Sequence, residues 1–325
     1  TWWPTCCIRW SIPASGIEVT RMEQTKQLTF DAGMKPRMNP FKSDAWKRFR
    51  KNKLALIGLA IILVMIAAAL LAPVLSANDP YTSLTDEAGL VLKNKSPADS
   101  GTLLGTDSLG RDVFSRVVYA ARVSMSVGIV AVSISTAVGV ILGALAGYLG
   151  GWVDSLIMRI VDVVCCFPVM FLVIIVATIL KPSIYNIMII IGLCNWTGMA
   201  RFVRGEILRV RELEYIQAAE SLGEHNSTII MRHVLPNIVA PILVEATMQM
   251  ARAILTEASL SYLGVGVQMP TASWGNMLMD ANNLSTLTMR PWQWVPPGVC
   301  ILLAVLSINF IGDGLRDAFD ARQKK

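Results

Sequence analysis

Charged residues are scarce in this chain. Only 16% of its 325 residues are Asp, Glu, Lys or Arg, whereas 54% are hydrophobic, and the mean hydropathy is +0.52. A soluble domain usually carries about 25% charged residues, so the composition excludes such a domain and indicates a membrane protein. In a membrane protein, a net charge of +6 indicates basic cytoplasmic flanks rather than nucleic-acid binding.

Several catalytic and ligand-binding signatures are also missing. No GxxxxGK(S/T) sequence occurs, so we predict that the chain does not itself hydrolyse ATP. The two histidines form no HExxH motif, and the six cysteines show no CxxC or Cys/His spacing that suits a metal. We therefore predict no catalytic residue, no directly bound cofactor and no metal site, and we expect the cysteines of the apolar runs to be buried small hydrophobic residues.

The N-terminal region divides into two predicted parts. Residues 1–21 contain neither the apolar core of a signal peptide nor a recognisable folded element. Because Glu18, Val19 and Thr20 can be encoded by a ribosome-binding sequence, we hypothesise that Met22 is the natural start and that residues 1–21 are non-native or translated upstream sequence. Residues 22–53 end in a cluster of Lys and Arg and are expected to form a cytoplasmic tail.

Long apolar segments follow this tail. Crossing a bilayer takes about 20 helical residues, and six segments are predicted to do so. The fold class is therefore an all-α integral membrane protein with about six transmembrane helices, the first at 54–75 and the other five within a core of residues 123–325. The later segments are approximately 123–153, 154–180, 183–200, 236–263 and 297–311. Six crossings place both termini in the cytoplasm.

The loop of residues 76–122 is predicted to be extracytoplasmic and to carry an amphipathic helix. In the stretch LGTDSLGRDVFSRVVYAARVS, Asp107 or Ser108 can cap such a helix. The helix is expected to lie on the outer membrane surface and to lead into the second span. Its apolar face consists of Val113, Phe114, Val117 and Val118, opposite Arg111, Arg116 and Arg122.

The stretch EYIQAAESLGEHNSTIIMRHVLPN, residues 214–237, is too polar to cross a membrane, and its residue pattern is too regular for an irregular loop. Its beginning predicts a short helix with an acidic first turn that ends at Gly223. A second helix, at 227–234, is expected to lead to Pro236 in the first turn of the fifth span. Ala218 and Ala219 leave one helix face small, which suits a groove on another protein. A plain cytoplasmic hairpin is the alternative.

The spacing of Ala218-Ala219, Gly223 and Leu235-Pro236 resembles the EAA signature of importer-type ABC transporter permeases. Gln217 stands where that signature has Glu. Further motifs resemble the C-type permease of dipeptide and oligopeptide importers, and the resemblance runs from Phe41 to the C-terminus. These motifs are AWKRFRKNKLALIGL, GTDSLGRDVFSRVVYAARVSMSVG, EASLSYLGVGV, ASWGNML and GDGLRDAFD.

The resemblance implies a type I ABC importer permease fold in the bacterial cytoplasmic membrane, where the chain forms half of a pore for dipeptides or oligopeptides. It implies a second homologous permease subunit, two subunits that bind ATP and Mg, and an extracytoplasmic solute-binding protein. A permease for nickel or another small solute is the alternative. The loop of residues 211–236 would couple the ATPase to alternating access. The implied coupling residues are Glu214, Tyr215, Ala218, Ala219, Leu222, Gly223, His233, Leu235 and Pro236.

Ionisable residues inside the predicted spans are costly in lipid, so we suspect them of a function. Glu245 and Arg252 are seven residues apart and share one side of the fifth span. We expect them, together with Glu257, either to line the pathway or to hold two permeases together.

Two other polar groups lie at predicted cytoplasmic ends of spans. Arg159 and Asp162 are one helical turn apart in the third span, so an ion pair between them is expected. Gly312-Asp313-Gly314 is expected to end the last helix near an ATP-binding subunit, with a solvated tail as the alternative.

Overall fold

The computed structural model describes residues 43–180 and 183–319. The hypothesis about residues 1–21, and most of the predicted tail at 22–53, lie outside the described residues. Within them all regular secondary structure is helical apart from two isolated bridges, Thr85 with Val91 and Thr106 with Asp112.

In the part of the chain that the structure describes, five helices are long and apolar enough to cross a membrane, with α12 continuing a segment that starts at Asn226. They are α3 (Lys53–Leu70), α6 (Val113–Leu149), α9 (Ile184–Arg211), α12 (Leu235–Tyr262) and α15 (Pro291–Phe319). A sixth crossing is broken: α7 (Gly151–Cys165) and α8 (Val169–Ile179) pass the same test together but are bent by 81°. Pro168 caps α8 at this bend, and a proline breaks a continuous helix there. The predicted all-α class with about six spans is confirmed.

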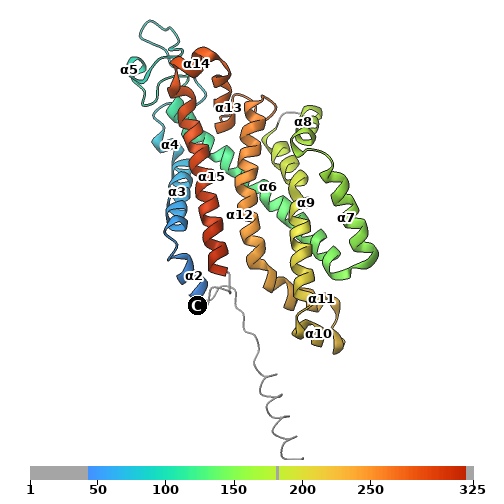
Figure 1. Cartoon of the computed structure of the whole chain (residues 1–325). Coiled ribbons are helices and arrows are strands. Elements are labelled where there is room, and N and C mark those ends of the chain that lie inside the picture. The colour runs from blue at the N-terminus through green and yellow to red at the C-terminus, as the bar shows by residue number, and fades with distance from the viewer. Residues whose placement is uncertain (1–42, 181–182, 320–325) are drawn as a thin grey trace, which may run out of the picture. The chain divides into compact units, whose positions relative to one another are not determined.

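The short helices gather at the two ends of the molecule (Figure 1). One end, called the loop end below, carries α4 (Ala72–Leu75), α5 (Pro97–Ser100), α13 (Trp274–Leu278), η2 (Met279–Asn282) and α14 (Leu284–Met289). The other, called the hairpin end, carries α2 (Ser43–Phe49), α10 (Glu214–Ser221), α11 (Asn226–Ile229) and η1 (Ile230–Val234).

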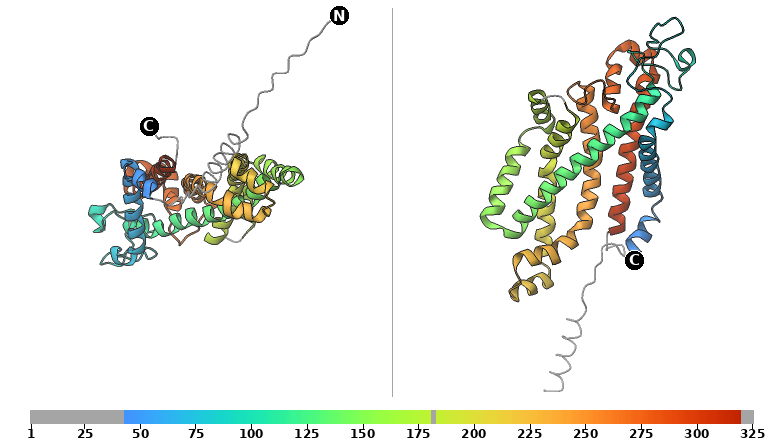
Figure 2. Two further views of the ribbon diagram at one scale, coloured as in Figure 1. Left: turned by 90° about the horizontal axis from the view of Figure 1, so that it is seen from below. Right: turned by 180° about the vertical axis from the view of Figure 1, so that it is seen from behind.

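One continuous helix, α6, connects these two ends. It has 37 residues and runs diagonally across the other long helices (Figure 2). Asp112 caps it by accepting a hydrogen bond from the N–H of Phe114.

The prediction of a separate surface helix, capped by Asp107 or Ser108, is therefore wrong. Arg122 is exposed, but the other two arginines are not part of a solvated face, because Asp107 lies 2.7 Å from the Nε of Arg111 and 3.5 Å from the Nε of Arg116. Arg116 is only 2% exposed. With its charges paired, this stretch is enclosed as the first turns of α6.

The second half of α6 packs closely against α9 through glycines spaced four residues apart. A Cβ atom on Gly143 would lie 2.6 Å from the carbonyl oxygen of Ala200, and one on Gly147 would lie 3.0 Å from Ile207. Only glycine lets the two backbones approach this closely. The small residues of this part of α6 thus determine how closely it packs on α9.

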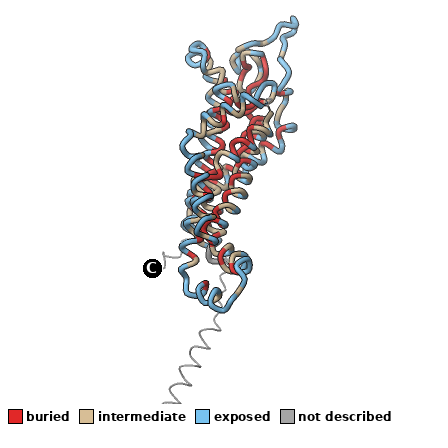
Figure 3. Tube along the Cα trace, turned by 90° about the vertical axis from the view of Figure 1, so that its right-hand side faces the viewer, coloured by how far each residue is buried: buried red, intermediate tan, exposed pale blue. Residues whose placement is uncertain are grey.

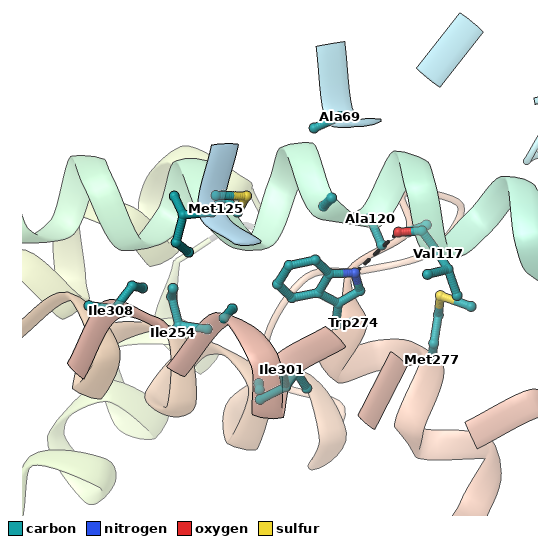
Figure 4. Close-up of a cluster of buried hydrophobic side chains, with 14 of the residues drawn as sticks. Ala69, Val117, Ala120, Met125, Ile254, Trp274, Met277, Ile301 and Ile308 are labelled. Atoms are coloured by element: carbon teal, nitrogen blue, oxygen red, sulfur yellow. Dashed lines mark hydrogen bonds between the residues drawn. The ribbon is translucent and has the colours of Figure 1, made fainter. Parts of the chain in front are cut away.

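The first half of α6 covers the largest apolar cluster, shown in Figure 4. Trp274 of α13 is 1% exposed there, and its indole Nε1 donates to the carbonyl oxygen of Val117 at 3.1 Å. Met125, Ile254 and Ile301 surround the ring. Figure 3 shows buried residues along the inside of the bundle and exposed residues along its rims. Exposed apolar side chains on outward helix faces suit contact with lipid.

Two expectations about small residues are wrong. Gly312 and Gly314 do not end a helix but lie within α15, where a Cβ on Gly312 would be 2.9 Å from Thr247 and one on Gly314 would overlap Ala55. They therefore allow close packing of α15 against its neighbours.

The cysteines, expected to be buried, are exposed or half-buried, because they lie on outward or partly covered helix faces. Cys165 and Cys166 are exposed, and Cys194 and Cys300 are half-buried. Cys6 and Cys7 lie outside the described residues.

Candidate functional site

The segment between α9 and α12, called the hairpin below, consists of α10, a turn, α11 and η1. Gly223 forms the turn with a φ of +78°, a conformation that favours glycine. The N–H groups of Gly223 and Glu224 donate to carbonyl oxygens in the last turn of α10, at 3.0 and 3.1 Å, which closes the helix end. η1 continues into α12, where Pro236 occupies the first turn. The predicted sequence of helix, glycine turn, helix and proline is confirmed.

The hairpin has an apolar inner face and an exposed outer face. Ile216, Ile229 and Val234 are 0% exposed and pack against α9 in one cluster. Leu222 at the turn is 87% exposed, and Ala218 is exposed as well. The inner face fixes the hairpin to the spans, whereas the outer face is left available to another protein.

The structure places all nine predicted coupling residues on the hairpin or the first turn of α12. Six are exposed and three are half-buried: Glu214, Tyr215, Ala218, Leu222, Gly223 and Pro236 in the first group, and Ala219, His233 and Leu235 in the second.

Two of these residues connect parts of the segment to one another. The Nε2 of His233 lies 3.2 Å from a carboxylate oxygen of Glu224. The hydroxyl of Tyr215 accepts a hydrogen bond from the Asn237 side chain at 2.9 Å. Burial raises the pKa of Tyr215, so its hydroxyl stays protonated at neutral pH. His233 and Tyr215 therefore fix the geometry of the hairpin.

Residues outside the predicted set connect the hairpin to α6. Tyr148, the penultimate residue of α6, is 4% exposed. Its hydroxyl lies 3.3 Å from Oδ1 of Asn226 and 3.5 Å from Oε1 of Glu220. Arg211, at the end of α9, donates from Nη1 to the Tyr148 carbonyl oxygen at 2.9 Å. Sequence patterns are local, and Tyr148 and Glu220 are 72 residues apart, so no pattern indicated this contact.

Within α12, the three suspected ionisable residues fall into two settings. Nη2 of Arg252 lies 2.6 Å from Oε1 of Glu245, with 61% of the arginine side chain and 26% of the glutamate side chain exposed. This confirms that the two share one side. Glu257 is 0% exposed and accepts hydrogen bonds from Ser124 at 3.1 Å and Ser261 at 2.7 Å. Its enclosure within the chain contradicts the prediction that it lines a pathway or an interface.

The acids of α7 pair with a different helix from the one expected. Asp154 accepts two hydrogen bonds from Arg204, at 2.5 and 2.6 Å, and Asp162 lies 2.6 Å from Arg201. The expected pair of Arg159 with Asp162 is therefore wrong. Because α9 packs beside α7, its arginines reach these carboxylates, and Arg159 is left exposed.

A second charged cluster lies at the loop end, around Asp107 and its two arginines. Asp280 of η2 approaches it and accepts a hydrogen bond from Ser108 at 3.3 Å. Burial, and next the charge of Asp107, raise the pKa of Asp280. Within residues 43–180 and 183–319, no three His, Cys, Asp or Glu side chains are grouped so as to hold a metal ion.

Comparison with known proteins connects this arrangement to transport. Residues 139–325 match the family of binding-protein-dependent transport system inner membrane components. Residues 40–97 match the N-terminal transmembrane domain of oligopeptide transport permease C.

Three relatives illustrate the similarity. The dipeptide transport system permease protein DppC of Alkalihalophilus pseudofirmus is 42% identical, over 86% of this chain and 90% of its own length. The oligopeptide transport system permease protein OppC of Bacillus subtilis is 39% identical, over 87% and 90%. The glutathione transport system permease protein GsiD of Pectobacterium atrosepticum is 39% identical, over 86% and 90%.

The family match covers more than half of this chain, and each of the three relatives matches 86% or more of it. The helical fold with its long apolar crossings is that of a multi-pass protein of the bacterial inner membrane. This chain belongs to the family of binding-protein-dependent transport system inner membrane components.

Proposed function

We propose that this chain is the transmembrane permease subunit of an ATP-driven importer of dipeptides or oligopeptides, and that ATP-binding subunits act on its hairpin. The observation that carries this proposal is Leu222, which is 87% exposed at a turn whose neighbouring helix has a buried inner face. A large apolar side chain displayed on a well-fixed turn suits a contact with another protein. The peptide substrate is supported by the names of the dipeptide, oligopeptide and glutathione relatives.

The proposed assembly supplies what this sequence lacks. Two partner subunits bind ATP and Mg and hydrolyse the nucleotide, since this chain has no phosphate-cradling loop, and the chain acts without catalysis of its own. A second homologous permease completes the pore as a heterodimer, and an extracytoplasmic solute-binding protein delivers the peptide.

The hairpin end lies in the cytoplasm in this proposal, together with both termini. Basic residues support this orientation, because cytoplasmic flanks of membrane helices are enriched in Lys and Arg. Two groups of basic residues lie at the hairpin end. The first, in α2 and the residues after it, consists of Lys47, Arg48, Arg50, Lys51 and Lys53. The second, in the hairpin and its flanks, consists of Arg209, Arg211 and Arg232.

The hairpin is suited to transmit a movement of the ATP-binding subunits because it is fixed to two membrane-spanning helices. Its inner face packs against α9, and η1 continues into α12 without a break. When the ATP-bound partners close, the hairpin moves with the groove that holds it, and α9 and α12 tilt with it. This motion alternates access to the pathway between the two sides of the membrane.

The exposed pair of Glu245 and Arg252 supports an assembly with a second permease. A charged pair facing lipid costs a few kcal/mol, so this side of α12 faces either the aqueous pathway or the partner permease. The substitution Glu245→Gln is expected to lower peptide uptake or permease pairing. If both stay normal, Glu245 has neither role.

The test of this function is uptake into proteoliposomes containing the complex that co-purifies with this chain. Labelled dipeptides and pentapeptides should enter only when ATP and the solute-binding protein are present. Nickel uptake is measured in parallel, and transport of nickel without transport of peptide would replace the peptide assignment. Uptake without ATP, or a chain that purifies without an ATPase, would contradict the importer itself.

Variants of Gly223 test the hairpin directly. Proline cannot adopt the φ of +78° found there, so Gly223→Pro should leave the membrane fold intact and abolish uptake while ATP hydrolysis continues. Asparagine tolerates the left-handed conformation, so Gly223→Asn should retain coupled transport. Equal behaviour of the two variants would remove this turn from the coupling mechanism.

A further inference from the structure

The contact between α6 and the hairpin combines four interactions at a single residue, Tyr148. The hydroxyl of Tyr148 reaches Asn226 at 3.3 Å and Glu220 at 3.5 Å. Its backbone carbonyl oxygen, one of the groups left without a partner at a helix C-terminus, accepts a hydrogen bond from Arg211 at 2.9 Å. The Arg211 guanidinium also lies over the tyrosine ring, 5.5 Å from its centre. Tyr148 thus joins the ends of α6 and α9 to both short helices of the hairpin.

The two acceptors of this hydroxyl lie on opposite sides of the Gly223 turn. Glu220 belongs to α10, and Asn226 is the first residue of α11. A tyrosine hydroxyl has a single proton to donate, so it can donate fully to only one of them at a time. A small rotation of α10 relative to α11 changes which acceptor is closer, and Tyr148 keeps one bond in either position.

Movement of Tyr148 is movement of α6, because the helix is continuous and closely packed. From Tyr148 back to Gly139 it lies against α9, where a Cβ on Gly143 would be 2.6 Å from the Ala200 carbonyl oxygen. At its other end, Val117 accepts the hydrogen bond from Trp274 of the loop end. A displacement at the hairpin end therefore reaches the loop end through one rigid element.

We propose that Tyr148 is a positioning residue that transmits movement of the hairpin to α6, and through α6 to the loop end. This inference rests on the proposed function, in which ATP-binding subunits move the hairpin. It identifies a third route besides the direct connections to α9 and α12, and it assigns the route to one hydroxyl and its two acceptors.

The test uses the assembled transporter in proteoliposomes and measures peptide imported per ATP hydrolysed. Tyr148→Phe keeps the ring and the Arg211 contacts but removes the hydroxyl. Assembly and ATP hydrolysis should stay near the wild-type level, while import per ATP falls about fivefold, as expected for the loss of one hydrogen bond. Tyr119→Phe is the matched control on the same helix. The Tyr119 ring contacts Arg122 and Tyr81, and its hydroxyl makes no hydrogen bond to any of the described residues, so this variant should behave as wild type.

The acceptors provide a second measurement. Glu220→Ala and Asn226→Ala each leave one acceptor, so each should lower import per ATP by less than Tyr148→Phe does. The double variant should match Tyr148→Phe. Equal, full losses in the two single variants would contradict an exchange between acceptors.

Two results would overturn the proposal. If Tyr148→Phe imports normally per ATP, the hydroxyl transmits nothing. If its assembly, hydrolysis and import all fall together, Tyr148 only holds the fold. In either case, uncoupling by Gly223→Pro would show that the hairpin still acts as proposed. Failure of the wild-type complex to couple ATP to import would instead reject the function on which this inference rests.

Discussion

At the loop end, Asp107 contacts Arg111 and Arg116, and none of these three side chains is more than 5% exposed. At the hairpin end, Arg209 and Glu206 form an ion pair at 2.6 Å in which 62% of the arginine side chain is exposed. The loop end thus encloses one charged cluster, whereas this ion pair and Leu222 of the hairpin end lie on the surface. We expect the enclosed cluster to stabilise the fold and the exposed residues of the hairpin end to be available for contact with other subunits.

Removing a buried charge should give the largest effect on stability. Asp107→Asn leaves Arg111 and Arg116 without their shared carboxylate in an enclosed site, and breaking a buried ion pair costs about 3–5 kcal/mol. The matched change at the hairpin end, Arg209→Met, breaks an exposed pair and should cost less than about 1 kcal/mol. Thermal unfolding of the two variants in detergent checks this contrast. Equal losses of stability would mean that the two ends do not differ as described.

The close packing of α6 on α9 should give the next largest effect. Gly143→Ala places a Cβ 2.6 Å from a backbone oxygen, and such overpacking costs about 1–3 kcal/mol. A Cβ on Gly205 of α9 would meet no atom from outside its own stretch of helix within 4 Å, so Gly205→Ala should gain about 0.5–1 kcal/mol from helix propensity. In unfolding measurements, Gly143→Ala should lower the free energy of unfolding and Gly205→Ala should raise it. A loss in both variants would show that helix packing does not decide the outcome.

Leu222 should affect partner binding without affecting the fold. Leu222→Asp is expected to weaken binding of the ATP-binding subunit more than about tenfold, while the unfolding temperature in detergent stays unchanged because the side chain is 87% exposed. Leu90→Asp is the matched control at the loop end, where the leucine is 68% exposed. This control should leave ATPase binding unchanged. Equal weakening by both would argue against a specific contact at the hairpin.

The sequence predicted the hairpin well because its signals are local. Gly223 needs a left-handed backbone and Pro236 needs a first helical turn, and both constraints act within a few residues. The apolar lengths likewise predicted the crossings, although Pro168 could have indicated the break between α7 and α8.

Contacts between distant segments were the part that the sequence did not predict. Arg116 has the spacing of a solvated basic face, and only the folded position of Asp107 and η2 encloses it. Asp162 has Arg159 one turn away but pairs with Arg201, 39 residues on. Gly314 belongs to a Gly-Asp-Gly sequence that suggested a helix end, but it lies inside a helix and packs against Ala55. In each case the packing of the helices, rather than the local spacing of residues, determines which residue is contacted.

Asp280 should give the smallest effect, and it tests whether the loop-end cluster titrates. Burial and the charge of Asp107 raise its pKa above the ordinary 3.8, outweighing Arg111 and Arg116. The folded protein therefore holds this proton to a higher pH than the unfolded chain does, so the contribution of Asp280 to stability decreases as pH rises from about 4 through the folded pKa. Asp280→Asn keeps a side-chain oxygen for the hydrogen bond from Ser108 and removes the titration. Unfolding temperatures measured across this range should show the wild type losing stability relative to the variant as pH rises. A difference that stays constant with pH would mean that the Asp280 carboxyl has the same pKa in both states and that its burial carries no electrostatic cost.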